Sequence, residues 1–125
     1  MVKEFARHTK VLVTHAGEAL AGPELSPTQS RELADLGATI ELTALSCQSM
    51  RGVKGKSPSE MAMMIATVGP DRCVLATDFG WAQDLPKPAE GFGDFLTSLW
   101  EHGVAESQIE VMASKNPARL LGVDV

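Results

Sequence analysis

CVLATD, residues 73–78, is the stretch that decides the fold. Its run of small and apolar residues, with no helical spacing, is typical of a strand buried on both faces of a parallel sheet. The run ends on an acid, Asp78, where the strand would leave the sheet, and a long loop follows to about Pro88. The sequence therefore predicts a strand at 73–77 that presents a carboxylate at its carboxyl end.

Two similar strand patterns precede this one, at 11–14 and 38–45. Two helix starts separate the three runs. Each has a Ser N-cap, a Pro at the first helical position, and a Gln or Glu three residues after the cap. Each helical pattern then stops at a glycine, which gives helices from Ser26 to Gly37 and from Ser57 to Gly69.

Further helical patterns come after the third strand, at 89–102 and from Ser107 to about Ala113. The first carries an apolar face of Phe92, Phe95, Leu96, Leu99 and Trp100, and the methionines of the preceding helix, Met61, Met63 and Met64, are expected in the core. Strands that alternate with helices predict an α/β fold: a parallel three-stranded sheet with flanking helices, in a single domain over 1–125.

Composition and charge exclude several function classes. A net charge of −5 gives no basic surface for nucleic acid. No apolar stretch is long enough for a membrane span, and no signal-peptide core is visible, so we expect a cytoplasmic protein without membrane or nucleic-acid partners. Two cysteines are too few for a disulfide scaffold, and Cys73, inside a strand, is expected to be a buried inert thiol.

The first and third strands both end on a polar side chain, His15 and Asp78. Because the carboxyl ends of parallel strands meet at one edge of a sheet, we expect these two groups on the same rim. An imidazole and a carboxylate brought together suit a divalent metal, or an acid/base pair in which the carboxylate fixes the imidazole tautomer. The alternative is that both side chains only cap neighbouring backbone groups.

Three further residues are secondary candidates. Glu41 lies inside an apolar strand, where an acid is costly unless paired; it either bonds to a neighbouring Lys or Arg or takes part in the site. Cys47 follows the second strand and could face the site. Trp81 could form a wall of a substrate pocket, or pack within its own loop.

Three segments, VLVTHAG at 11–17, RCVLATD at 72–78 and NPARLLG at 116–122, resemble the C-terminal half of metal-dependent hydrolases of the amidohydrolase superfamily. The resemblance covers about residues 8 to 122 and implies the last three strands of a (β/α)8 barrel. It implies that His15 and Asp78 are metal ligands and that Asp78 is also the general base. It further implies a divalent cofactor, with zinc as the first candidate, and a small-molecule amide, ester, lactone or phosphoester substrate. Asn116 and Arg119 would hold the last helix in place.

The chain lacks several parts of the family's pattern. The HxH pair of the first strand, the bridging Lys or Glu of the fourth and the His of the fifth have no counterpart, and a full barrel takes about 250 residues. A catalytic zinc typically has three protein ligands, so the site is expected to be incomplete in one chain. Open sheet edges would then be covered in a homo-oligomer, or by a separate chain that supplies the N-terminal half.

Two alternatives to an enzyme stay open on the sequence. The chain could be a non-catalytic half-barrel that serves as a structural or oligomerisation domain. It could also be a small α/β binding domain of another ancestry.

Overall fold

A computed structural model of the chain describes residues 1–20, 22–80 and 85–124. Three strands, β1 (Val11–Val13), β2 (Ala38–Thr43) and β3 (Cys73–Ala76), form one parallel sheet in the order β1-β2-β3. Val13 pairs with Ile40 and Thr43 with Ala76, so the carboxyl ends of all three strands face the same edge of the sheet, although β1 stops before β2 and β3 do. The predicted α/β fold with a parallel three-stranded sheet and flanking helices is confirmed.

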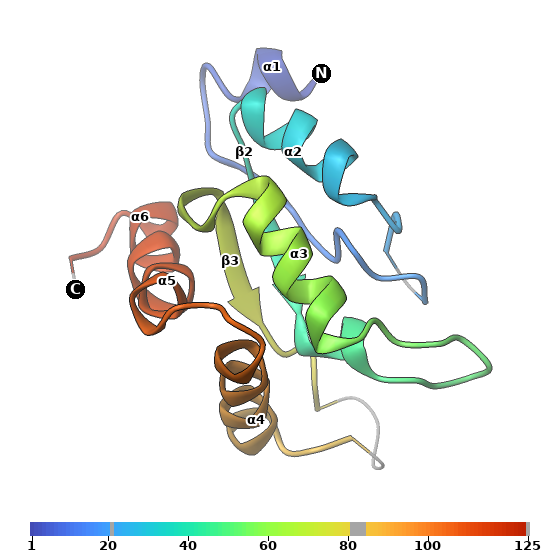
Figure 1. Ribbon diagram of the computed structural model, residues 1–125. Coiled ribbons are helices and arrows are strands. Elements are labelled where there is room, and N and C mark those ends of the chain that lie inside the picture. The colour runs from blue at the N-terminus through green and yellow to red at the C-terminus, as the bar shows by residue number, and fades with distance from the viewer. Residues whose placement is uncertain (21, 81–84, 125) are drawn as a thin grey trace.

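The two helices that connect the strands, α2 (Pro27–Asp35) and α3 (Pro58–Val68), lie side by side in front of the sheet (Figure 1). Both begin with the predicted capping box. Ser57 Oγ accepts from the backbone N–H of Glu60 at 3.2 Å, and Glu60 Oε2 accepts from the N–H of Ser57 at 2.7 Å. Two of the otherwise unpaired N–H groups at the helix start are thereby satisfied.

The C-terminal region packs beside β3 and against α3. α4 (Pro88–Glu101) is followed by α5 (Glu106–Glu110), a π-helical segment η3 (Val111–Lys115) and α6 (Asn116–Leu121). The helix predicted to start at Ser107 begins one residue earlier, because Gln108 Oε1 accepts from the N–H of Ala105 at 3.0 Å and so caps it. α6 gives the NPARLLG segment a helical structure.

Asn116 anchors this region. Its side-chain amide donates to the carbonyls of Pro70, at 2.8 Å, and Cys73, at 2.7 Å, at the start of β3. At the other end of α6, Lys10 Nζ donates to the carbonyls of Arg119 and Leu120. The contact at Arg119 is therefore made by its backbone.

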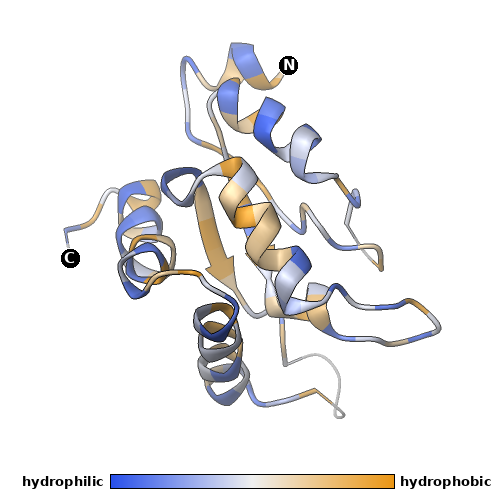
Figure 2. Ribbon diagram, in the orientation of Figure 1, coloured by the Kyte–Doolittle hydropathy of each residue, from blue (hydrophilic) through white to orange (hydrophobic). Residues whose placement is uncertain are grey.

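One hydrophobic core fills the space between the sheet and the helices, and the strand β3 and helix α3 that enclose it are strongly apolar (Figure 2). Alternate strand residues point into this core, as expected for a sheet covered on one face by helices. The core includes Ile40, Leu42, Cys73 and Leu75 from the strands, Met61, Met64, Ile65 and Val68 from α3, and Phe95, Leu99 and Met112 from the C-terminal region.

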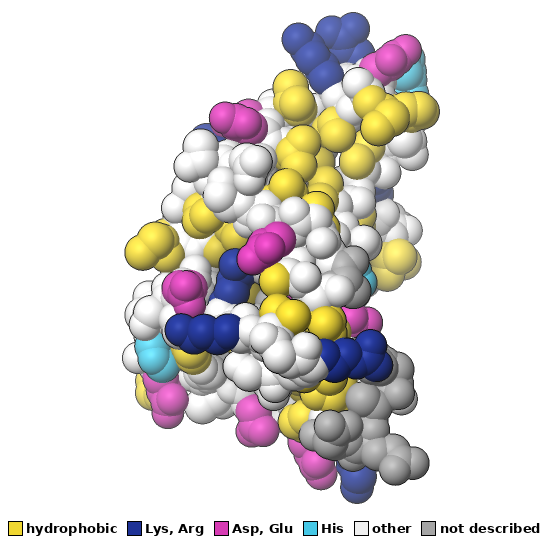
Figure 3. All heavy atoms as spheres, turned by 90° about the vertical axis from the view of Figure 1, so that its right-hand side faces the viewer, with side chains coloured by type: hydrophobic (Ala, Val, Ile, Leu, Met, Phe, Trp, Pro, Cys, Tyr) yellow, Lys and Arg dark blue, Asp and Glu magenta, His cyan; other side chains and the backbone are white. Residues whose placement is uncertain are grey.

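The face of the sheet that points away from this core is partly exposed to solvent near β1. Leu12 is 40% exposed, Thr14 is exposed, and Thr39 and Glu41 are half-buried. On the side of the molecule seen in Figure 3, hydrophobic side chains also reach the surface between charged groups. Within the described sheet, β1 and β3 each have a single strand neighbour.

The structure also differs from the sequence predictions at the end of β2, in the exposure of two side chains and at the N-terminus. β2 ends at Thr43 rather than at 45, because Thr43 Oγ1 accepts from the N–H of Ser46 at 3.3 Å and starts a 3₁₀ turn, η1 (Ala44–Cys47). Met63, expected in the core, is 63% exposed, and Trp100, assigned to the apolar face of its helix, is 61% exposed, since each lies on the outer side of its helix. A one-turn helix, α1 (Val2–Phe5), was not predicted from the charged N-terminal stretch.

Two short 3₁₀ turns are also present, η1 after β2 and η2 (Pro70–Arg72) before β3.

None of the helices in the described ranges has both the length and the apolar character needed to cross a bilayer.

Candidate metal centre at the carboxyl ends of the strands

His15 and Asp78 lie just beyond the carboxyl ends of β1 and β3. Both have left-handed backbone conformations, with φ of 52° and 57°. Non-glycine residues adopt this conformation rarely and at an energetic cost, and such residues cluster at functional sites. Here the conformation turns the chain sharply at the end of each strand and holds the two side chains at the rim.

The two side chains meet across the end of β2. His15 Nδ1 lies 3.4 Å from Asp78 Oδ2. Both are partly open to solvent, with 29% of the imidazole and 35% of the carboxylate side chain exposed. The structure thus brings together the two principal sequence candidates, at a place that a small molecule can reach.

Glu18 is a third member of this cluster and was not among the residues predicted for the site. Glu18 Oε2 lies 2.6 Å from His15 Nδ1. A turn in which the N–H of Glu18 donates to the carbonyl of His15, at 3.1 Å, places it there. One ligand atom from each of His15, Glu18 and Asp78 lies within 4.8 Å of the other two.

The Glu18 side chain is almost fully buried, with 3% of its area exposed. Its second oxygen, Oε1, is buried without a hydrogen-bond partner among the described residues. A buried carboxylate oxygen without a partner destabilises the folded protein, and a hydrogen-bond donor or a cation bound to it would offset this cost. A cation bound by both oxygens of this carboxylate would recover that cost, and the three side chains together offer the nitrogen and oxygen donors that a divalent metal takes.

The surroundings of His15 favour its protonated form. The hydrogen bond with Glu18 is the largest of the effects that raise the pKa of His15. Partial burial opposes the rise, and the charges of Asp78, Glu18 and Glu41 add to it. A negative potential that attracts a proton to this position also attracts a metal cation.

Glu41 supports the site from β2. Its carboxylate accepts from the backbone N–H of His15 at 3.2 Å, and its carbonyl accepts from the N–H of Ala16 at 3.3 Å. The partner of this acid is therefore a main-chain amide rather than the Lys or Arg expected from the sequence. Glu41 fixes the sharp turn that aims the imidazole of His15.

Gly22 allows the loop after β1 to fold back over this turn. A Cβ at position 22 would lie 2.8 Å from His15 Cβ and 2.9 Å from the carbonyl oxygen of Glu18, so no other residue fits without a shift. The close approach holds the backbone of this turn, while the Glu18 side chain lies beside the segment from Leu45 to Gly55.

The remaining sequence candidates lie elsewhere or outside the described residues. Cys47 lines a separate hollow beside α4, and burial raises its pKa to about 11, so it is a protonated thiol at neutral pH. It is not among the residues of the cluster. Trp81 lies outside the described residues. Cys73 is buried in the core, and burial raises its pKa to about 12, consistent with an inert thiol.

Comparisons with known proteins do not assign a family. No family model matches the chain, and no curated protein matches its sequence.

Proposed function

We propose that His15, Glu18 and Asp78 bind one divalent metal ion and that the protein acts in metal-assisted hydrolysis. The observation that carries the proposal is the meeting of three ligand atoms within 4.8 Å at the rim of the sheet, one of them from a buried carboxylate whose other oxygen has no partner in the described part of the chain. The resemblance to metal-dependent hydrolases of the amidohydrolase superfamily agrees with this chemistry.

The three side chains suit different roles. Glu18, buried beside His15, holds the ion in place, while the imidazole of His15 supplies a nitrogen ligand. A bound divalent ion lowers the pKa of a water molecule toward neutrality. The carboxylate of Asp78, which reaches solvent, can accept the proton of that water and act as general base.

The donor set narrows the choice of metal. One imidazole nitrogen and two carboxylate oxygens suit zinc or manganese better than a soft, thiolate-seeking ion. Zinc is the first candidate because three protein ligands of this kind leave the open position that a catalytic zinc needs. The substrate would be a small molecule with a hydrolysable amide, ester, lactone or phosphoester bond.

The proposal includes a partner for the open side of the sheet. β1 and β3 each have one strand neighbour in the described sheet, and Leu12 is 40% exposed on the less covered face. A second copy of the chain, or a separate chain with the N-terminal half of a barrel, would cover these surfaces. The free thiols Cys47 and Cys73 suit a reducing compartment, so the proposal places the protein in the cytoplasm.

Metal content per chain tests the proposal. The purified protein is stripped with a chelator, dialysed against zinc or manganese, and then measured beside His15→Ala and Asp78→Ala. His8→Ala is the matched control, because His8 is an exposed imidazole in the N-terminal stretch. We expect about one ion per chain in the parent and the control, and none in the two site variants. Absence of bound metal in the parent would overturn the proposal.

A second candidate function is a non-catalytic oligomerisation domain, and the exposed Leu12 on the open face favours it. Light scattering of the parent and of Leu12→Lys, taken together with the metal content of the parent, distinguishes the two. An oligomer that dissociates in the variant, in a parent that binds no metal, would support the second candidate.

A further inference from the structure

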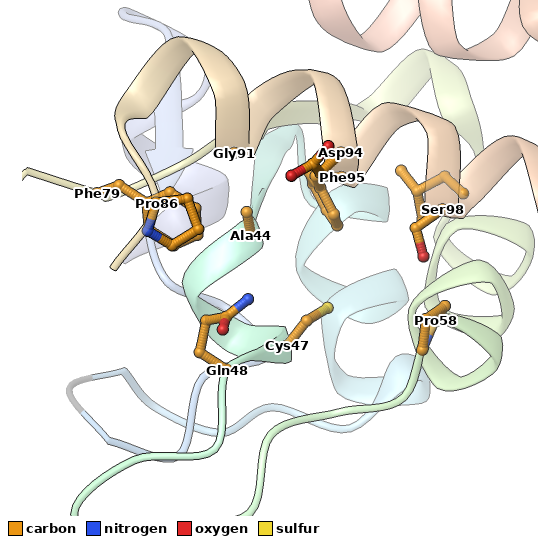
Figure 4. A pocket seen from close by; sticks show the side chains of 11 residues that line it. Ala44, Cys47, Gln48, Pro58, Phe79, Pro86, Gly91, Asp94, Phe95 and Ser98 are labelled. Carbon is orange, nitrogen blue, oxygen red and sulfur yellow. The ribbon is translucent and has the colours of Figure 1, made fainter. Parts of the chain in front are cut away.

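A hollow of about 270 Å³ lies next to the rim but separate from the His15 cluster. η1 forms its floor, α4 its roof, and the start of α3 one end (Figure 4). Its lining is Ala44, Cys47, Gln48, Pro58, Phe79, Pro86, Gly91, Asp94, Phe95, Ser98 and Leu99. Several of these residues come directly after the carboxyl ends of β2 and β3, which is where open α/β sheets bind ligands.

One wall of the hollow is held by a close contact. The ring of Phe79 lies directly against the backbone of α4 at Gly91, where a Cβ would collide with it. Gly91 is buried, and Pro86 covers the same spot from the loop side. Phe79 is therefore fixed by packing, and the hollow exists without a ligand to open it.

The lining combines an apolar interior with one charge. Most of the lining is apolar and includes the side chains of Phe79 and Phe95, and Asp94 is the single charged residue among the eleven. Within the described part of the chain, the Asp94 carboxylate has no hydrogen bond or ion pair, and Figure 4 shows it at the edge of the hollow. The thiol of Cys47 adds no second negative charge at neutral pH, since its pKa is about 11.

We propose that this hollow binds a small organic cation: one ring-sized apolar group that carries a single ammonium. The apolar group fits the interior, because a cavity of about 150 Å³ already holds benzene. The ammonium pairs with Asp94, and the two phenylalanine rings favour a positive charge beside them. The proposal is independent of the metal centre, whose residues do not line the hollow.

Three probes of one size and different charge test the proposal on the full chain, with a chelator present to exclude metal effects. Benzylamine is the cation, benzyl alcohol the neutral match and benzoate the anion. Amide NMR shifts report where each one binds. We expect shifts at residues 44–48 and 94–98, with the tightest binding for benzylamine, weaker binding for benzyl alcohol and the weakest for benzoate.

Two variants assign the binding to the hollow. Asp94→Asn should weaken benzylamine about threefold, the size expected for a partly exposed ion pair, and leave benzyl alcohol unchanged. Glu90→Gln is the matched control, because it removes an exposed charge one turn away on α4, outside the lining. Ser98→Phe should block all three probes by filling the hollow, with the melting temperature as the check on folding.

The outcomes are decisive in both directions. Selective binding of benzylamine that Asp94→Asn weakens and Ser98→Phe abolishes would establish the site. Any one of four results would overturn the proposal. These are equal binding of the neutral probe, no effect of Asp94→Asn, binding that survives in a folded Ser98→Phe, and no binding at all.

Discussion

His15 and Asp78 follow two strands, β1 and β3, that do not pair with each other, yet His15 Nδ1 lies 3.4 Å from Asp78 Oδ2. The two side chains reach across the end of β2. Glu41 of β2 accepts a hydrogen bond from the backbone N–H of His15. The site therefore depends on the alignment of all three strands, and a change in any one of them should be felt at the cluster.

Glu18→Gln tests the buried ligand. The variant keeps an oxygen that can accept from His15, but it removes the negative charge that a cation needs. We expect zinc at about a hundredfold excess over its dissociation constant to stabilise the parent by about 2.7 kcal/mol and to have almost no effect on the variant. Thermal unfolding with and without zinc measures this. Glu24→Gln, an exposed acid in the same loop, is the control. An equal zinc effect in Glu18→Gln would remove Glu18 from the ligand set.

The stability of the metal-free protein should depend on the protonation of His15. Its pKa is raised in the folded state, chiefly by the hydrogen bond with Glu18. The protonated imidazole therefore stabilises the fold fully below its unfolded pKa of about 6.5, and this contribution is lost as the pH rises through the raised folded pKa. Urea unfolding across this range in a chelator, together with an NMR titration of His15, checks the prediction. In Glu18→Gln the titration should move back toward the ordinary value; an unchanged midpoint would contradict the assigned cause.

Asn116→Asp tests the anchor of the C-terminal helices. The variant has nearly the same shape, but a carboxylate would face the carbonyl oxygens of Pro70 and Cys73 in place of an amide donor. The carbonyl of Cys73 would lose a buried donor, while that of Pro70 keeps the N–H of Cys73. Because a buried carboxylate would also lie against both oxygens, we expect a loss of about 2–4 kcal/mol in the free energy of unfolding. Urea denaturation measures the loss, with the exposed Ser114→Ala as control. If Asn116→Asp lost no more stability than the Ser114→Ala control, α6 would be held in place by other contacts.

Two glycines of α4 should respond in opposite ways to alanine. Gly91→Ala would push a methyl group into the ring of Phe79 and cost about 1–3 kcal/mol. Gly93→Ala meets no atom within 4 Å, so it should gain about 1 kcal/mol from helix propensity. Thermal melting of the pair distinguishes a steric effect from a propensity effect, and equal stabilisation of both variants would show that Phe79 does not rest on the helix.

Much of the fold could be predicted because its signals are local. The Ser-Pro helix starts and the stopping glycines located α2 and α3 to within about a residue, and continuous apolar runs marked the strands. The end of β2 could not be seen in the same way, since it depends on a hydrogen bond from Ser46 to the side chain of Thr43. The outward positions of Met63 and Trp100 depend on how each helix is rotated against its neighbours.

The candidate site was predicted only in part for a related reason. His15 and Asp78 come after strands, so topology alone predicts that they share a rim. Glu18 lies in a loop without periodicity, and it joins the cluster through the turn in which its N–H donates to the carbonyl of His15. An acid three residues after a strand-end histidine was the available signal, because a tight turn brings such positions together.

The π-helical segment η3 sets the orientation of α6. A π turn holds one residue more than an α turn, so it acts as a one-residue spacer between α5 and α6. Deleting one residue from it, such as Ser114, would allow regular α-helical bonding but rotate the rest of the chain by about 100°. The amide of Asn116 would then point away from β3. The wider π turn is locally the less favourable geometry, but it keeps the side chain of Asn116 directed at β3.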